Sequence, residues 1–338
     1  MLCRVANYIN TMKILLIAGC NIEYTPVVRA YMEYLDECRC HCEVVEYVPG
    51  RRVKFISESI RKLVKNSYEK IVFINFQSLP LALFASIFVK NRFIYWKLES
   101  YSAFDAPDLV LKLQLFEWLI PRSRFSLVLP NNQRVDIQRP VFRHVYVLPN
   151  APLRPYLETD EVELKEEKNQ AAEQVNFVLY GNLGDSSQFF LDEWVSSVRN
   201  SECIRLTVIG GVDRIEPNVN FRSKLPNALL KGELKSGAFL YSIVGYRNTG
   251  LNTLYAAPNK LIESLSCGMP IIGHSGNPYV AEIIRKYSCG ILVDFNNISL
   301  DDIERQFVDR RLHRMNSINA AADLCLMNKV MQTPLRIL

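Results

Sequence analysis

The sequence predicts an α/β protein made of two doubly wound, Rossmann-like domains that face each other across a cleft. Short apolar runs rich in β-branched residues alternate with longer segments of helical periodicity, a pattern typical of parallel strands covered by helices. One acidic stretch near the middle of the chain interrupts this alternation. The length of 338 residues is sufficient for two domains that each bury a core.

The first half of the chain predicts one domain over residues 1–155. Its expected helices are Val27–Cys38 and Ile56–Lys65, because apolar residues recur there with helical spacing. Residues 1–11 show no such pattern and are expected to be flexible. The expected strands are Lys13–Ala18, Glu43–Tyr47, Lys70–Asn75, Phe93–Lys97, Phe125–Leu129 and His144–Leu148.

Residues 156–173 predict an acidic linker, because Glu158–Glu173 offers almost no large apolar side chain to a core. A second domain is expected over residues 174–317, and the helical segment 318–338 is expected to pack back onto the first domain. The expected strands of the second domain are Asn176–Tyr180, Ile204–Ile209, Ala238–Val244, Pro270–Gly273 and Gly290–Val293. Its expected helices are Phe189–Arg199, Pro258 to about Cys267, and Val280–Tyr287.

The composition excludes few functions. The net charge of +5, from 40 basic and 35 acidic side chains, is too small and too dispersed for a nucleic-acid-binding protein.

Nine cysteines, an odd number, favour reduced thiols and a cytoplasmic location. We interpret Cys38–Cys42 as ordinary thiols between a helix and a strand, with a zinc site as the weaker alternative. Ile17–Cys20 resembles a lipoprotein cleavage box, but the apolar run before it is too short for a signal core.

A membrane span is not expected. The longest apolar run, Leu79–Val89, is much shorter than the roughly 20 residues that cross a bilayer. The basic and aromatic segment Lys90–Lys97 that follows has two interpretations. We favour a helix that leads into a buried strand; the alternative is a patch that rests on the inner face of an anionic membrane.

The segment Pro258–Pro270 carries the main functional signal. Proline suits the beginning of a helix, and Gly268 followed by Pro270 suits its end. The amino end of such a helix attracts a phosphate, and Lys260 adds a positive charge in the first turn. Glu263 has the chemistry to accept two hydrogen bonds from a ribose diol; the alternative is a carboxylate on a solvated helix face.

Two glycine-rich turns follow expected strands in the second half, at Gly181–Gly184 and Gly210–Gly211. Ligands of open α/β sheets bind at the carboxyl ends of strands, where glycine lets the backbone approach them. Neither turn has the spacing of a G-x-G-x-x-G fingerprint, which argues against a nicotinamide enzyme.

These segments together resemble glycosyltransferase family 4 and related GT-B glycosyltransferases. The main match is Pro258–Glu263 followed by Cys267–Gly273; further matches, in the same order, are Leu148–Pro152, Tyr180–Leu183, Leu206–Gly211 and Gly290–Asp294. The resemblance implies that Glu263 binds the donor ribose and that Lys260 stabilises the departing diphosphate. The donor-binding set is then Gly181, Asn182, Gly210, Gly211, Tyr255, Pro258, Asn259, Lys260, Leu261 and Glu263.

The sequence departs from the family pattern at two places. Tyr255 stands where many members have a glutamate that contacts the donor sugar, and Asp185–Gln188 lacks the basic pair expected after the first turn. Lys260, helped by Arg247 or Arg214, is expected to neutralise the diphosphate instead. His274 has two interpretations, a donor contact and a histidine in a surface loop.

The first half of the chain would then bind the acceptor. Gly19–Asn21 corresponds to a loop near the reaction centre, and Glu99 and Asp105 are the candidate general bases. His144 begins a strand and is expected to be structural.

The resemblance implies transfer of a hexose from a nucleoside-diphosphate sugar to a sugar or lipid-linked glycan hydroxyl in polysaccharide or glycan biosynthesis. It implies a retaining reaction without a metal or other cofactor. Two alternatives remain, a catalytically inactive partner subunit of the same fold and a nucleotide-sugar epimerase.

Overall fold

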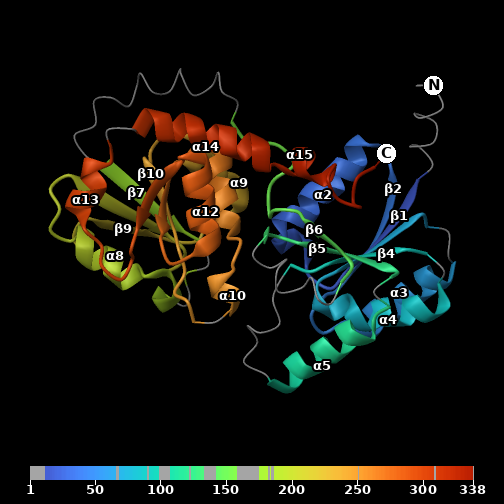
Figure 1. The fold of residues 1–338 in the computed structure, drawn as a ribbon. Coiled ribbons are helices and arrows are strands. Elements are labelled where there is room, and N and C mark those ends of the chain that lie inside the picture. Colours follow the sequence, from blue (N-terminus) through green and yellow to red (C-terminus); the bar gives the residue numbers. More distant parts are fainter. Residues whose placement is uncertain are drawn as a thin grey trace, which may run out of the picture. The chain divides into compact units, whose positions relative to one another are not determined.

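The computed structural model describes residues 12–65, 68–89, 91–98, 107–121, 123–132, 142–157, 175–181, 183, 186–249, 251–307 and 310–337. The chain divides into two compact units (Figure 1). Unit 1 comprises residues 1–153 and 326–338, and unit 2 comprises residues 154–325. The expected leader 1–11 and residues 158–173 of the expected linker lie outside the described residues.

Unit 1 contains a six-stranded parallel sheet in the order β2-β1-β3-β4-β5-β6. The buried strands have the apolar, β-branched composition of a sheet that is covered on both faces. The strands are β1 (Lys13–Ala18), β2 (His41–Glu46), β3 (Lys70–Ile74), β4 (Phe93–Trp96), β5 (Phe125–Leu129) and β6 (His144–Val147).

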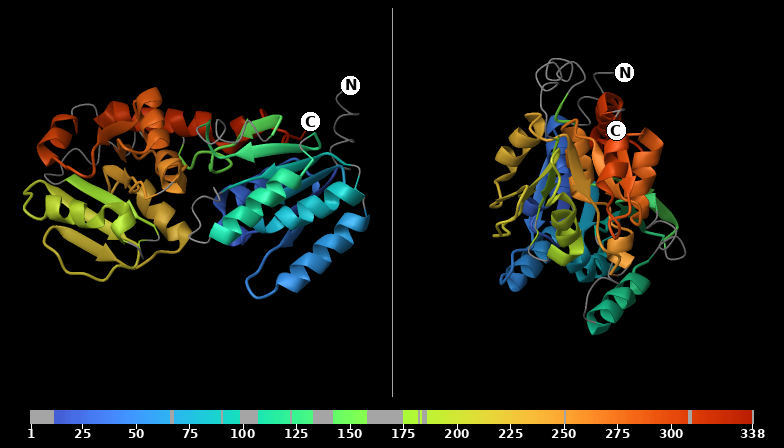
Figure 2. Two further views of the ribbon diagram at one scale, coloured as in Figure 1. Left: turned by 60° about the horizontal axis from the view of Figure 1, so that its bottom comes forward. Right: turned by 90° about the vertical axis from the view of Figure 1, so that its left-hand side faces the viewer.

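Successive side chains of β1 point into two different cores. Leu15 and Ile17 pack in the core formed with α3 (Arg52–Lys65), α4 (Leu79–Phe88) and α5 (Pro107–Leu119). Ile14 and Leu16 pack on the other face, against α2 (Pro26–Glu37) and α15 (Leu326–Val330). The helices α3, α4 and α5 therefore lie together on one side of this sheet (Figures 1 and 2).

The end of the chain belongs to unit 1. The Tyr31 hydroxyl of α2 donates a 3.0 Å hydrogen bond to the carbonyl of Leu335, and Leu326, Val330 and Leu335 are buried. These contacts hold the last residues against the sheet face that α2 covers.

Unit 2 contains a second six-stranded parallel sheet, in the order β12-β11-β10-β7-β8-β9. Its strands are β7 (Val175–Tyr180), β8 (Ile204–Ile209), β9 (Val219–Arg222), β10 (Tyr241–Val244), β11 (Ile271–His274) and β12 (Gly290–Val293). Its helices are α8 (Leu191–Val198), α9 (Asn227–Lys235), α10 (Leu251–Leu254), α11 (Asn259–Ser266), α12 (Pro278–Tyr287), α13 (Leu300–Arg305) and α14 (Arg310–Leu324). Short 3₁₀ helices occur at Ile22–Tyr24, Phe76–Ser78 and Ser186–Phe189.

The two sheets confirm the predicted fold class, and the expected strands agree with the observed ones except at some ends. One expected strand, Ala238–Val244, begins only at Tyr241. β9 was not predicted, because Val219–Arg222 is only 4 residues long and contains no apolar run. The aromatic rings of Phe93–Trp96 are buried in β4, which corrects the interpretation of this segment as an aromatic membrane patch. Among the described residues, every helix falls short of the length and apolar character of a membrane span.

Each sheet has one position at which the chain reverses its direction of winding. In unit 1 this position lies between β1 and β3, and in unit 2 between β7 and β10. The loops that leave neighbouring strands there run to opposite sides of the sheet and leave a crevice at the carboxyl ends of the strands. Ligand sites are therefore expected at these two places.

Candidate functional site

Helix α11 begins beside the sheet reversal of unit 2. Pro258 is its N-cap residue, with an extended backbone (φ −64°, ψ 127°), so the helix begins one residue later than predicted. Its end is fixed by Gly268 (φ +66°): the Gly268 N–H donates to Leu265 O and the Met269 N–H to Ser264 O, both at 2.9 Å. Gly268 therefore ends the helix, as predicted, and this pair of bonds is a Schellman arrangement.

Tyr180, the last residue of β7, ties that strand to the first turns of α11. Its buried hydroxyl donates to the carbonyl of Lys260 at 3.0 Å and lies 2.9 Å from Oγ of Ser264. The carboxyl end of β7 and the amino end of α11 are thereby held together. Sequence reasoning included Tyr180 only as part of a turn motif and missed this contact.

The side chain of Lys260 lies across the backbone of Gly181. A Cβ atom at position 181 would be 2.3 Å from Cε of Lys260 and 2.8 Å from its Nζ. Gly181 also has φ +127°, a backbone conformation that residues other than glycine rarely adopt. Glycine at this position therefore makes room for the lysine, and two residues far apart in the sequence meet at the reversal between β7 and β10.

Aromatic rings surround the ammonium group of Lys260. Its Nζ lies 3.9 Å from the ring centroid of Phe189 and 5.9 Å from that of Tyr246. Burial among these groups lowers the pKa of Lys260 to about 7, and Glu263 opposes this shift. The half-buried Glu263 lies one turn further along α11, on the same side as Lys260. The site therefore holds a lysine that readily gains a proton when an anion approaches.

The loop after β10 completes these surroundings and is fixed by a buried asparagine. The Tyr246 N–H donates to Oδ1 of Asn277 at 2.7 Å, and Nδ2 of Asn277 donates back to Tyr246 O at 3.2 Å. Asn277 precedes α12, so it joins the carboxyl ends of β10 and β11. Phe189, Tyr246 and Asn277 were not predicted as site residues, because only the folded sheet brings them beside Lys260.

The second glycine turn packs against the first. A Cβ atom at Gly210 would be 2.6 Å from the carbonyl oxygen of Gly181, and the Gly181 N–H donates to Ile209 O at 2.9 Å. Gly211 follows with its N–H directed to Arg222 O at 3.4 Å. The turns after β7 and β8 thus lie together at the carboxyl ends of these two strands.

The remaining predicted donor residues fall into different environments. Pro258 is buried and Asn259 is exposed. Leu261 is fully buried, so it contributes packing. Tyr255 is half-buried between α10 and α11. Asn182 lies outside the described residues, as do the candidate bases Glu99 and Asp105.

The two arginines expected to assist Lys260 each form an ion pair at the beginning of α8. Arg214 pairs with Asp192, and Arg247 pairs with Glu193. The guanidinium of Arg247 also lies 4.5 Å from the ring centroid of Phe190. In this arrangement both arginines already have carboxylate partners.

His274 is neither exposed nor in a loop, which corrects one of its two interpretations. It is the last residue of β11 and only 4% exposed, and its Nδ1 accepts a 3.2 Å hydrogen bond from the Phe295 N–H. The rings of Phe190 and Phe295 pack on it, and burial lowers its pKa. His144 is exposed at the beginning of β6.

Three cysteines of unit 1 lie where α2 is followed by β2. Cys38, Cys40 and Cys42 are half-buried against the core that α2 covers, and burial raises the pKa of each. Within the described part of the chain, no group of three or more histidine, cysteine, aspartate or glutamate side chains is arranged to hold a metal ion.

Solved structures with the same architecture cover nearly the whole chain. The sucrose-phosphate synthase of Thermosynechococcus elongatus superimposes with a TM-score of 0.67 over 95% of this chain and 96% of its own, at 15% identity. The chain has the GT-B fold. A glycosyltransferase from Rickettsia africae matches with a TM-score of 0.63 over 96% of this chain and 97% of its own, at 13% identity.

Another GT-B structure, Anabaena HepE in complex with UDP-glucose, matches at 11% identity with a TM-score of 0.62, over 95% of this chain and 98% of its own. No protein-family model and no curated protein sequence matches the chain. At these identities the likeness establishes the GT-B fold, and the chemistry must be argued from the residues of this chain.

Proposed function

We propose that this protein is a glycosyltransferase that moves a hexose from a nucleoside-diphosphate sugar to a hydroxyl of a sugar or lipid-linked glycan. The observation that supports this proposal most strongly is the position of Lys260. It lies over Gly181 at the sheet reversal of unit 2, in the first turn of α11 and one turn before Glu263. A cation, free amide groups and a carboxylate at such a place suit a diphosphate joined to a ribose.

Transfer of the hexose requires stabilisation of the departing diphosphate, because negative charge accumulates on it as the glycosidic bond breaks. Lys260 is well suited to this role, since an approaching diphosphate raises its lowered pKa and keeps it protonated. The free N–H groups of α11 point toward the same anion. Glu263 would accept hydrogen bonds from the ribose hydroxyls and so fix the position of the nucleotide.

We further propose that the reaction retains the anomeric configuration and uses no metal ion, with the diphosphate neutralised by Lys260 and α11. The pathway would be the synthesis of a polysaccharide or another glycan. HepE, with UDP-glucose bound in its structure, makes a UDP-sugar the first donor to test.

A thermal-shift screen of nucleoside-diphosphate sugars tests the proposal. We expect at least one of them to raise the unfolding temperature of the full chain, since a ligand that binds only the folded state stabilises it. The free nucleoside diphosphate should stabilise as well, and the free sugar should not. If none of the nucleoside-diphosphate sugars has an effect, the glycosyltransferase proposal is wrong. If one binds but no hexose transfer to any offered acceptor follows, a catalytically inactive subunit becomes the better account.

A further inference from the structure

Helix α5 of unit 1 is apolar on its exposed side as well as on the side that packs on the sheet. Leu111, Leu115 and Trp118 follow one outward stripe and are 68%, 53% and 65% exposed. The carboxylate of Glu117 is instead buried. It forms an ion pair with Lys97, whose Nζ lies 2.9 Å from Oε1 of Glu117. A surface helix of a globular protein normally has polar side chains on its outward side. The outer side of α5 therefore has the properties of a surface that another body covers.

The apolar stripe continues onto the neighbouring helix. Ile87 and Phe88, at the end of α4, are 69% and 66% exposed. The ring of Phe88 packs against that of Phe84, with the two ring centroids 4.7 Å apart. The helices α4 and α5 lie side by side on one face of the sheet (Figure 2). We define the α4–α5 surface as Ile87, Phe88, Leu111, Leu115, Trp118 and Leu119. The large apolar side chains exposed on unit 2, such as Ile215, Leu229 and Leu312, stand apart from one another in the sequence.

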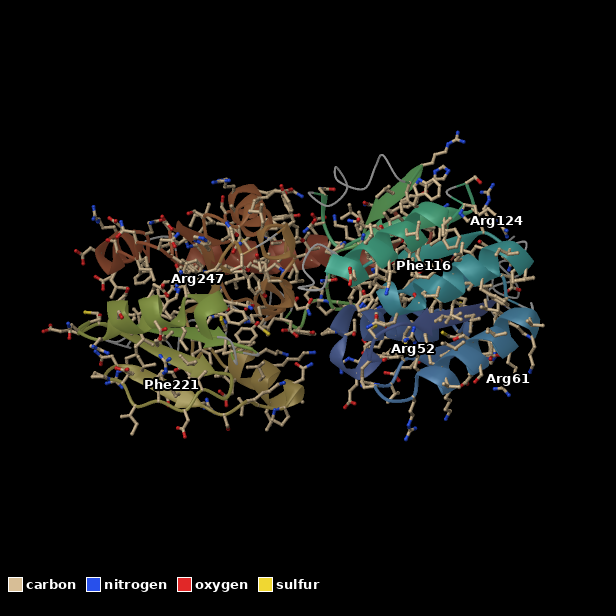
Figure 3. All side chains as sticks on the ribbon, turned by 90° about the horizontal axis from the view of Figure 1, so that it is seen from below. Arg52, Arg61, Phe116, Arg124, Phe221 and Arg247 are labelled. Carbon is tan, nitrogen blue, oxygen red and sulfur yellow. The ribbon has the colours of Figure 1, made fainter. Side chains whose placement is uncertain are left out.

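Positive charge flanks this apolar surface on the side of α3. Helix α3, on the other flank of α4, contains five basic residues and one acidic residue, Glu58. Arg52, Lys54 and Arg61 on it are exposed, as is Lys112 on α5. The view from below shows Arg52, Arg61 and Phe116 on this same face of unit 1 (Figure 3). A cationic margin around exposed leucine and tryptophan side chains is the chemistry of a protein surface that binds an anionic membrane.

An apolar groove opens between α3 and α5 on this face, with α4 as its floor. Its volume is about 450 Å³, and its apolar lining includes Phe55, Phe84 and Phe116. Arg52 and Lys112 stand at its two sides. The groove thus combines an apolar interior with two cations, which suits the chain and the headgroup of an anionic lipid.

We propose that unit 1 docks on an anionic lipid bilayer through the α4–α5 surface, with Trp118 and its neighbours in the interfacial layer and the cations of α3 and Lys112 on the headgroups. A second copy of the chain is a poorer occupant. A symmetric contact would bring the cationic margins of both copies together, whereas the bilayer supplies the opposite charge. The docking surface is independent of the proposed donor site, and its test does not use enzyme activity.

The fluorescence of the chain reports directly on this surface. The sequence has three tryptophans, and of these Trp96 and Trp194 are fully buried whereas Trp118 is exposed. We expect the full-length protein to sediment with vesicles of phosphatidylcholine and phosphatidylglycerol, and more weakly with phosphatidylcholine alone. Lipids brominated near the headgroup should quench the emission of the bound protein, and Trp118→Phe should remove most of that quenching while binding persists.

Two pairs of substitutions complete the test. Leu115→Glu with Trp118→Glu should reduce the vesicle-bound fraction at least about tenfold, because two apolar contacts are lost and two like charges face the headgroups. The same exchange at the exposed apolar positions Leu229 and Leu312 of unit 2 is the matched control and should leave binding unchanged. Arg52→Glu with Lys112→Glu should weaken binding to the anionic vesicles selectively.

Circular dichroism of each variant verifies that it is folded. Absence of binding to anionic vesicles, or equal loss in the unit 2 control, would overturn the proposal. So would a dimer in solution that Leu115→Glu dissociates, because a second copy would then be the occupant.

Discussion

The reversals of the two sheets have the same topology but are filled differently. In unit 1 a Cβ atom at Gly19, which follows β1, would be 2.7 Å from the backbone nitrogen of Ser78 and 2.9 Å from the carbonyl oxygen of Ile74. In unit 2 a Cβ atom at Gly181, which follows β7, would meet the end of the Lys260 side chain. Gly19 is therefore packed against main chain, whereas Gly181 is packed against the end of a lysine side chain.

This difference separates a structural glycine from one beside a ligand site. Main chain next to Gly19 is held by the hydrogen bond from the Gly19 N–H to Ile74 O (2.7 Å) and has no means to move aside. The side chain of Lys260 changes rotamer without disturbing the sheet. A phosphate that enters the unit 2 crevice would thus meet a cation that adjusts to it. Substitutions in unit 2 and at Gly19 of unit 1 should therefore have different effects.

The largest effect is expected from Lys260→Ala. Removal of the cation that stabilises the departing diphosphate should lower kcat/KM for hexose transfer by roughly 10²–10³-fold, the usual effect of losing one preorganised charge-stabilising group. Lys224→Ala, at an exposed lysine of the same unit, should leave kcat/KM unchanged. Equal activity of Lys260→Ala and the wild type would contradict the assignment of the site.

A smaller effect is expected from Glu263→Gln. Loss of charged hydrogen bonds to the ribose should raise the donor KM by about 10-fold to 100-fold. The decisive comparison uses a donor analogue that lacks the ribose hydroxyls. The wild type should discriminate strongly against it, and Glu263→Gln should not. If the variant discriminates as well as the wild type, Glu263 contacts something else.

The donor affinity should depend on pH through Lys260. In the free protein its pKa is lowered to about 7, chiefly by burial, and a bound diphosphate would raise it. Above pH 7 binding must then add a proton, so the affinity should fall roughly tenfold per pH unit. Below this pKa the lysine is already charged and adds no pH dependence. Titration calorimetry across this range should show the slope for the wild type, and Lys260→Arg, which stays protonated, should lose it.

The smallest effect on donor binding is expected at Gly19. Gly19→Ala forces a Cβ against fixed main chain and should cost about 1–3 kcal/mol of stability, seen as a lower unfolding temperature, with an unchanged donor Kd. Gly181→Ala should instead displace Lys260 and weaken donor binding. Weakened donor binding in Gly19→Ala, with no loss of stability, would reverse the assignment of the two glycines.

Local patterns in the sequence predicted most of the fold. Apolar, β-branched runs marked the buried strands, and Pro258 with Gly268 marked both ends of α11 to within a residue. α5 escaped prediction because Pro107–Leu119 is apolar on all sides and therefore lacks helical periodicity. β9 escaped because Val219–Arg222 has no apolar run, and its alternation of apolar and polar residues covers only 4 residues.

The candidate site was predictable only in part, for a physical reason. Lys260 and Glu263 are three residues apart on one helix, so their common side follows from the sequence. The approach of Lys260 to Gly181 and Phe189 depends on the pairing of β7 with β10, which no local pattern encodes. The ion pairs of Arg214 and Arg247 with the acids of α8 likewise arise only in the folded sheet.

As a glycosyltransferase, the protein would bind its donor at the reversal of the unit 2 sheet. Hydrogen exchange of the full chain, measured with and without saturating UDP-glucose or whichever nucleoside-diphosphate sugar stabilises the chain, tests it most directly. We predict slower exchange in the first turn of α11 and in the segment after β7, and no such protection when Lys260 is replaced by alanine. Protection confined to unit 1, or equal protection in Lys260→Ala, would contradict the claim.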